Sequence, residues 1–78
     1  MITLLNMKLN QHAVITSVNH PDEGMERRLF DLGFYPGTTV EKVLVSPHQD
    51  PVAYRVRGTT VALRNSDAQY IQIKEEGK

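Results

Sequence analysis

The absence of cysteine is the feature that most constrains this chain, because the sequence is only 78 residues long. Small domains that bury little apolar surface are often stabilised by disulfides or by thiolate-bound zinc. Neither is available here, and an iron–sulfur cluster or a cysteine nucleophile is excluded as well. The hydrophobic core alone must stabilise the fold, so we expect one domain over residues 1–78 and a cytoplasmic location.

Charge and hydropathy exclude further classes of protein. Nine Lys and Arg residues balance nine Asp and Glu residues, whereas dedicated nucleic-acid binders are usually strongly basic. The uncharged start, Met1–Met7, is far shorter than the roughly 20 apolar residues of a membrane-spanning helix. It also lacks the basic start and the cleavage site of a signal peptide. We therefore expect no nucleic-acid partner and no membrane span, and we interpret residues 1–8 as a short leader.

The first strand is predicted over His12–Val18, which is rich in β-branched residues and is followed by turn formers at residues 19–22. Ala13 and Ile15 share one face, but Val18 breaks the period of two. A β-bulge near Thr16 or Ser17 would return Val18 to the core side.

A change to helical spacing predicts one helix over residues 24–32, with Met25, Leu29 and Leu32 on one face. Gly33 suits the left-handed position that ends a helix in a Schellman motif, in which Phe34 packs on Leu29. The sequence therefore predicts a sharp stop at Leu32.

The rest of the chain reads as short strands joined by turns. Tyr35–Thr38 has proline and glycine in the order of a type II turn. Further along the chain, two alternating runs on either side of Gly58 predict a β-hairpin that turns at this glycine. The predicted elements after the turn are a strand over Thr39–Val45, a loop over 46–51, strands over 52–57 and 60–64, a cap or short 3₁₀ turn over Asn65–Asp67, a strand over Tyr70–Ile73 and a frayed tail over 75–78.

Five short strands bury one continuous face best by curling into a small barrel, since an open sheet would leave two long edges. The predicted fold is therefore mainly β, an SH3-like barrel of about five strands with one short helix inserted after the first strand.

Several segments in the right order resemble the FeoA family over nearly the whole chain. Residues 27–38, RRLFDLGFYPGT, are similar to its R-R-L-x-x-L-G-(hydrophobic)-x-P-G-(small) segment. Pro47 and Asp50–Pro51 resemble its P-x-x-D-P loop. Residues 56–68 resemble its V-x-G-x-x-(I/V)-A-L-R-x-x-x-A hairpin and turn. One departure is Asn10, where the family commonly has glycine, but asparagine tolerates a left-handed backbone.

The resemblance implies a cytosolic protein of bacterial ferrous iron uptake that acts with the membrane transporter FeoB. The first hypothesis is a non-enzymatic accessory protein, monomeric or weakly self-associating, that docks on the cytosolic part of a FeoB-type transporter. The alternative is a metal- or peptide-sensing domain, because similar domains occur at the C-terminus of iron-dependent repressors of the DtxR type. No phosphate-binding loop, dinucleotide fingerprint or nucleophile elbow is present, which argues against an enzyme.

Two sets of residues are candidates for binding. His20, Asp22 and Glu23 place an imidazole and two carboxylates on one loop, where they could contact Fe(II) or another divalent ion weakly, or simply be solvated. No other cofactor is expected. For the partner, the helix, the following turn and the hairpin tip offer exposed arginines and an aromatic edge. The candidate docking residues are Arg27, Arg28, Tyr35, Pro36, Arg57 and Gly58.

The segment between Pro51 and Ser66 holds three arginines and no acid. Because Arg55 and Arg57 are two residues apart in the predicted strand, we expect them to share a strand face as a local basic stripe. The stripe is either a docking surface or a solvated face whose carboxylate partners come from other strands.

Overall fold

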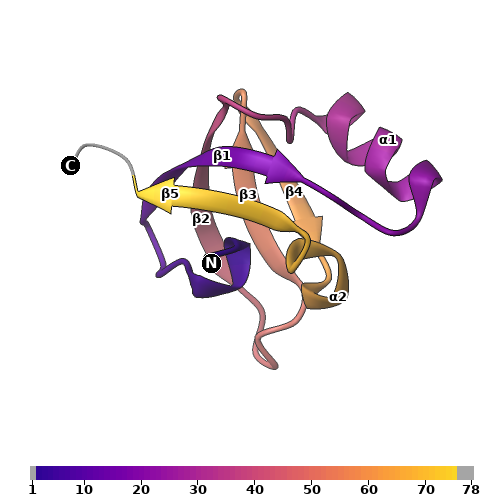
Figure 1. Cartoon of the computed structure of the whole chain (residues 1–78). Coiled ribbons are helices and arrows are strands. Elements are labelled where there is room, and N and C mark those ends of the chain that lie inside the picture. The colour runs from indigo at the N-terminus through magenta and orange to yellow at the C-terminus, as the bar shows by residue number, and fades with distance from the viewer. Residues whose placement is uncertain (1, 76–78) are drawn as a thin grey trace.

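The computed structural model describes residues 2–75, which form a bent antiparallel sheet flanked by short helices (Figure 1). The elements in chain order are the 3₁₀ helix η1 (Leu4–Asn6), β1 (His12–Val18), α1 (Glu23–Leu32), β2 (Thr39–Val45), β3 (Val52–Val56), β4 (Thr59–Leu63), α2 (Asn65–Ala68) and β5 (Ile71–Glu75). Of the predicted tail, Glu75 is the last residue of β5, and residues 76–78 lie outside the described residues.

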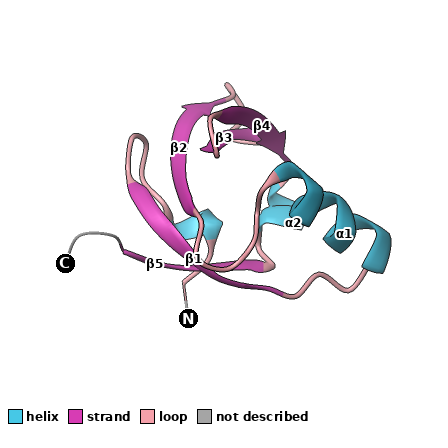
Figure 2. Ribbon diagram, turned by 90° about the horizontal axis from the view of Figure 1, so that it is seen from above, coloured by secondary structure: helices cyan, strands magenta, loops and turns pink. Residues whose placement is uncertain are grey.

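The sheet has the strand order β4-β3-β2-β1-β5, and every neighbouring pair is antiparallel. It curls around the core, so that β1 and β5 face β3 and β4 across the interior (Figure 2). A seam stays open between β4 and β5, and α2 connects these two strands. The mainly β fold with five strands and a helix after the first strand is confirmed, as a barrel that is nearly closed.

The curvature of the sheet comes partly from two register shifts. One lies between Ile15 and Ser17 in the pairing of β1 with β5, which confirms the predicted bulge. It leaves Val18 on the buried side, only 6% exposed. The other lies between Lys42 and Leu44 in the pairing of β2 with β3, and the even run of valines and leucines there gave no sign of it.

Helix α1 ends as predicted. Gly33 adopts the left-handed conformation at φ +108. Its N–H donates to the carbonyl of Phe30 at 3.0 Å, and the N–H of Phe34 donates to the carbonyl of Leu29 at 2.9 Å. These two hydrogen bonds form the Schellman motif, and they bring Phe34 into the core with no exposed surface. The type II turn follows, with Gly37 at φ +92 and the N–H of Thr38 donating to the carbonyl of Tyr35 at 3.1 Å.

The N-terminal residues are part of the packed structure. Leu4 is fully buried and Met7 is 3% exposed, although the sequence indicated only a leader. The hydroxyl of Tyr54 donates to the carbonyl of Leu4 at 3.4 Å, and burial raises the pKa of Tyr54 to about 12. Asn10 adopts the left-handed conformation at φ +70, as its resemblance to a glycine position implied. None of the helices described within residues 2–75 has the length and apolar composition of a membrane-spanning helix.

Candidate functional site

The exit from α1 meets the tip of the β3–β4 hairpin. Arg57 and Gly58 form its two-residue loop with φ +52 and φ +79, the positive pair that a type I′ turn requires. The guanidinium carbon of Arg57 lies 5.6 Å from the centre of the Tyr35 ring, within the range of a cation–π interaction. Residues 22 positions apart in the sequence are therefore held together at the surface.

The stem of Arg57 also packs over the end of α1. A Cβ atom added at Gly33 would lie 3.3 Å from the Cδ atom of Arg57 and 3.5 Å from its Cγ atom. The absence of a side chain at Gly33 thus serves both the left-handed helix end and the close approach of Arg57. The stem of Arg57 therefore lies over Gly33, and its guanidinium group lies over the ring of Tyr35.

Four of the six predicted docking residues lie together here, and we call them the Tyr35–Arg57 surface: Tyr35, Pro36, Arg57 and Gly58. An open hollow of about 440 Å³ is lined by Tyr35, Pro36 and Arg57 together with residues 37–39. Pro36, Arg57 and Gly58 are exposed and Tyr35 is half-buried. The hollow is wide and shallow, a shape that suits contact with another macromolecule better than an enclosed small ligand.

The other two predicted docking residues lie elsewhere on α1. Arg27 and Arg28 are exposed, and neither forms an ion pair with any described residue, the neighbouring acids of α1 included. Arg28 lines a different hollow, between α1 and β4, which it shares with Arg64. The structure therefore separates Arg28 from the Tyr35–Arg57 surface.

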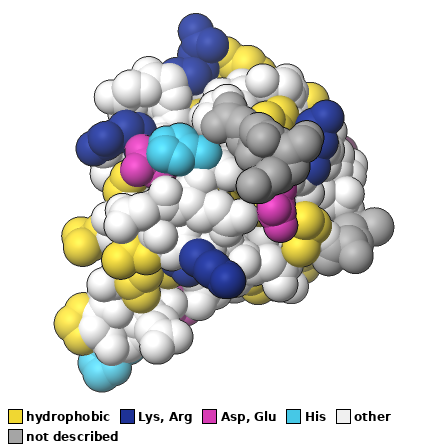
Figure 3. Space-filling view, turned by 90° about the vertical axis from the view of Figure 1, so that its left-hand side faces the viewer, with side chains coloured by type: hydrophobic (Ala, Val, Ile, Leu, Met, Phe, Trp, Pro, Cys, Tyr) yellow, Lys and Arg dark blue, Asp and Glu magenta, His cyan; other side chains and the backbone are white. Residues whose placement is uncertain are grey.

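The expected basic stripe is wrong in one respect. Arg57 lies in the hairpin loop beyond the end of β3, so it does not share a strand face with Arg55. Arg55 instead has a carboxylate partner from β2, because its Nη1 atom lies 3.9 Å from Oε1 of Glu41. Nε2 of His12 is 3.5 Å from the same oxygen. Figure 3 shows one place on this face of the molecule where basic, acidic and histidine side chains lie next to one another.

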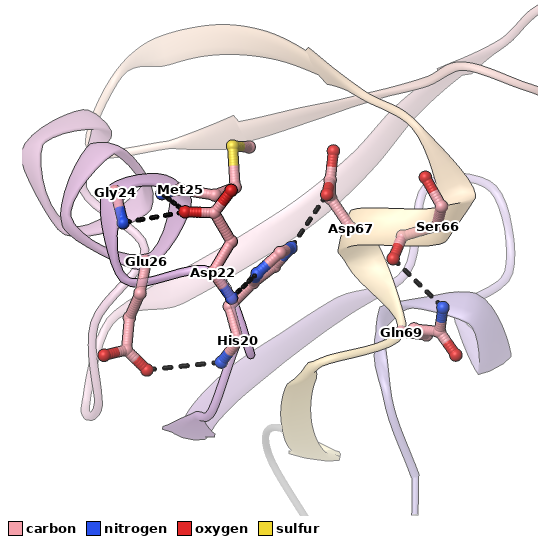
Figure 4. A network of polar contacts seen from close by, with 8 residues as sticks. All are labelled: His20, Asp22, Gly24, Met25, Glu26, Ser66, Asp67 and Gln69. Atoms are coloured by element: carbon pink, nitrogen blue, oxygen red, sulfur yellow. Dashed lines mark hydrogen bonds and ion pairs between the residues drawn. The ribbon is translucent and has the colours of Figure 1, made fainter.

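His20, the first of the candidate metal ligands, is part of a polar network between the start of α1 and α2 (Figure 4). Its side chain is only 8% exposed. The N–H of Asp22 donates to Nδ1 at 3.0 Å, so Nε2 carries the proton and donates to Oδ1 of Asp67 at 2.8 Å. The ring also meets Tyr70 edge-on, with 4.9 Å between the ring centres. Both ring nitrogens are therefore in use within the fold.

Asp22 is the N-cap of α1, where Oδ1 accepts hydrogen bonds from the N–H groups of Gly24 at 2.9 Å and Met25 at 3.2 Å. Glu23, the third candidate ligand, is exposed in the first turn of the helix. Within residues 2–75, no three His, Asp or Glu side chains are grouped so that they could hold a metal ion. A metal at this loop would have to displace the cap and the His20 hydrogen bonds.

Sequence reasoning missed Asp67, which contacts His20 although it is 47 residues away in the sequence. No local pattern marks such a pair. The sequence placed Asp67 in a predicted cap or turn and indicated no partner for its carboxylate.

Comparisons with known proteins match nearly all of the described chain. The model of the FeoA domain matches residues 2–75. A Porphyromonas gingivalis protein, the Fe(2+) transport protein A/Fe(2+) transporter FeoB fusion protein, is 38% identical over 48 residues, which are 62% of this chain. These residues are only 6% of the fusion protein, so this chain is similar to a small part of it.

Solved structures show the same fold. The crystal structure of FeoA from Stenotrophomonas maltophilia in complex with zinc is 34% identical, with a TM-score of 0.85 over 95% of this chain and 91% of that chain. A manganese-dependent transcriptional repressor is 15% identical, with a TM-score of 0.84 over 95% of this chain and 41% of that chain. The second likeness is one of fold alone.

Proposed function

The chain belongs to the FeoA domain family, and we propose that it is a non-enzymatic accessory protein of ferrous iron transport in the cytoplasm. In this role it docks on the cytosolic part of a FeoB-type transporter through the Tyr35–Arg57 surface. The Porphyromonas gingivalis relative supports this partner, because it joins FeoA and FeoB in one chain. Such a fusion keeps two modules at high effective concentration, which is useful when they act together.

The observation that carries the choice of surface is the stacking of Arg57 on Tyr35 at 5.6 Å. Arginine and tyrosine are the residue types that most often dominate the energy of protein interfaces. A guanidinium group already held over a ring loses little conformational freedom on binding, and its N–H edge stays available for a carboxylate. The partner surface we expect is therefore acidic.

A docking role also fits the chemistry of the loop before α1. His20 and Asp22 use their polar side-chain atoms to connect α1 with α2 and to cap α1. In this proposal Fe(II) is the cargo of the transporter, and the accessory protein contributes a rigid surface. The Stenotrophomonas maltophilia FeoA was put forward as a ferrous iron transport activating factor, which is in line with such a role.

Binding to the cytosolic domains of the FeoB-type transporter from the same organism tests the proposal. Isothermal titration, with and without guanine nucleotide, would compare the wild-type chain with Arg57→Ala and with a matched control, Arg55→Ala, which replaces an arginine that contacts Glu41 and does not line the hollow. We expect Arg57→Ala to weaken binding about 10-fold or more, as loss of an interface hot spot does. Arg55→Ala should change the affinity less than about twofold, because surface ion pairs contribute little.

Two results would overturn the proposal in different ways. If wild-type protein binds the transporter domains in neither nucleotide state, the partner is wrong. If binding occurs but Arg57→Ala and Arg55→Ala behave alike, the partner stands and the Tyr35–Arg57 surface is wrong.

A further inference from the structure

The two edges of the sheet differ in how they are protected. At the β5 edge, Thr3 forms a bridge with Gln72, and the N–H of Ile73 donates to the carbonyl of Ile2 at 3.0 Å. The N-terminal segment thus covers that edge. At the other edge, β4 pairs with β3 on one side only.

The outer side of β4 offers unpaired backbone groups. Val56 and Thr59 flank the two-residue loop and are the first hydrogen-bonded pair, and Val61 opposite Tyr54 is the next. Thr60 and Ala62 alternate with these pairs, so their N–H and C=O groups point away from β3. No described residue forms a backbone hydrogen bond with these outward groups. Such an edge is a template for another strand.

A groove runs beside this edge. Helix α1 lies beyond β4 on the side away from β3 (Figure 1), and a hollow of about 210 Å³ separates the two elements. Its apolar lining comes from Met25 and Leu32 of α1 and from Val61, Ala62 and Leu63 of β4. An added strand would place alternate side chains on the face of Val61 and Leu63, where the groove can receive them.

The charged side chains around the groove favour an acidic ligand. Arg28 and Arg64 line it from opposite sides, and neither forms an ion pair with a described residue. Asp67 also lines the groove, but its Oδ1 atom accepts the hydrogen bond from His20. The two free guanidinium groups can each hold a carboxylate.

We infer that β4 and the groove beside α1 bind an extended segment of a partner protein as a sixth strand, with alternating apolar residues and acidic residues near its ends. The backbone of the segment pairs with Thr60 and Ala62, its apolar side chains enter the groove, and its carboxylates contact Arg28 and Arg64. This is strand addition, in which main-chain hydrogen bonds supply affinity and alternate pockets supply specificity. It does not rest on the proposed function, because the groove and the Tyr35–Arg57 surface are lined by different residues.

A synthetic peptide tests the inference without knowledge of the natural ligand. The probe is a peptide of alternating valine and threonine with glutamate near both ends, titrated into the full ¹⁵N-labelled chain. We expect chemical-shift changes at residues 60–62 and in α1, and slower hydrogen exchange at the amides of Thr60 and Ala62. A control peptide with the same side chains but N-methylated on alternate amides cannot form the ladder, so we expect its binding to fall at least 10-fold.

Variants of the chain locate the contacts. Ala62→Pro removes an outward N–H that β3 does not use, so the fold should tolerate it while peptide affinity falls at least 10-fold. Arg28→Ala and Arg64→Ala should each weaken binding about two- to fivefold, in line with exposed ion pairs. Arg27→Ala, a neighbouring exposed arginine that does not line the groove, should leave the affinity unchanged.

The inference is overturned if the probe causes no shifts at millimolar concentration, if the N-methylated peptide binds equally well, or if Arg27→Ala weakens binding as much as Arg64→Ala. Binding that Arg57→Ala reduces but Ala62→Pro does not would also overturn it, because the peptide would then occupy the Tyr35–Arg57 surface. Loss of transporter binding with peptide binding intact would leave this inference standing and refute only the proposed function.

Discussion

Replacing Gly33 by alanine should destabilise the fold through two separable effects, and Gly37→Ala offers a matched control for one of them. Both glycines have positive φ, +108 and +92. A Cβ atom at Gly33 would meet Arg57 at 3.3 Å and Val56 at 3.5 Å, whereas one at Gly37 would meet nothing within 4 Å. The two substitutions therefore share the backbone strain, and only Gly33→Ala adds a contact.

The expected magnitudes follow from these environments. A left-handed backbone destabilises the folded state by about 1 to 2 kcal/mol at a residue with a Cβ atom. Alanine also lowers the conformational entropy of the unfolded chain, which offsets about 0.4 to 1 kcal/mol of this loss. Gly37→Ala should thus lower the free energy of unfolding by about 1 kcal/mol. Gly33→Ala should lower the free energy of unfolding by roughly 1 kcal/mol more than Gly37→Ala does. This value is at the low end of the range for overpacking, because the flexible stem of Arg57 can move away. That added cost should disappear when Arg57 is also replaced by alanine.

Urea unfolding followed by circular dichroism would measure all three variants. For a domain of this size, each kcal/mol should also lower Tm by about 4 to 8 °C. Equal stabilities of Gly33→Ala and Gly37→Ala would refute the close packing of Arg57 on the helix end. Wild-type stability for Gly37→Ala would refute the strain argument itself.

Two further predictions concern the core and the start of α1. Because burial raises the pKa of Tyr54 to about 12, its contribution to stability is complete below pH 10 and is lost as the pH rises through 12. The loss should approach roughly 2 to 3 kcal/mol above pH 12, and about half of it should have occurred by pH 11. Urea unfolding of Tyr54→Phe between pH 8 and 11 should lack this decline. Asp22→Ala should lower the free energy of unfolding by about 1 kcal/mol through loss of the N-cap. Glu23→Ala, measured in the same way, should cost less, and an equal loss for both would contradict the capping role.

The features that the sequence predicted correctly are those with local causes. Gly33 ends α1 and Gly37 completes the turn because only a few neighbouring residues decide each backbone conformation. The bulge at residues 16–17 was visible because Val18 broke the alternation. The β3–β4 hairpin was visible from two alternating runs about Gly58.

The features that escaped prediction depend on contacts distant in sequence. Arg57 was placed in a strand because its residue type gives no hint of a left-handed conformation, yet the two-residue loop requires one. The contact of Asp67 with His20 was not predicted, because the two residues are 47 positions apart and only the tertiary fold brings α2 next to the start of α1. Leu4 and Met7 were assigned to a leader because a short apolar run without a period does not reveal what it packs against.

Both binding surfaces proposed for this chain depend on the insertion of α1 between β1 and β2. The Schellman motif and the type II turn direct the chain from α1 to β2 and leave Tyr35 beside the hairpin tip, where Arg57 can stack on it. The same helix forms the second wall of the groove along β4. If α1 moved relative to the barrel, the stack and the groove would change together. A ligand that shifts α1 at one surface should therefore alter the affinity at the other, and by linkage the factor is the same in both directions.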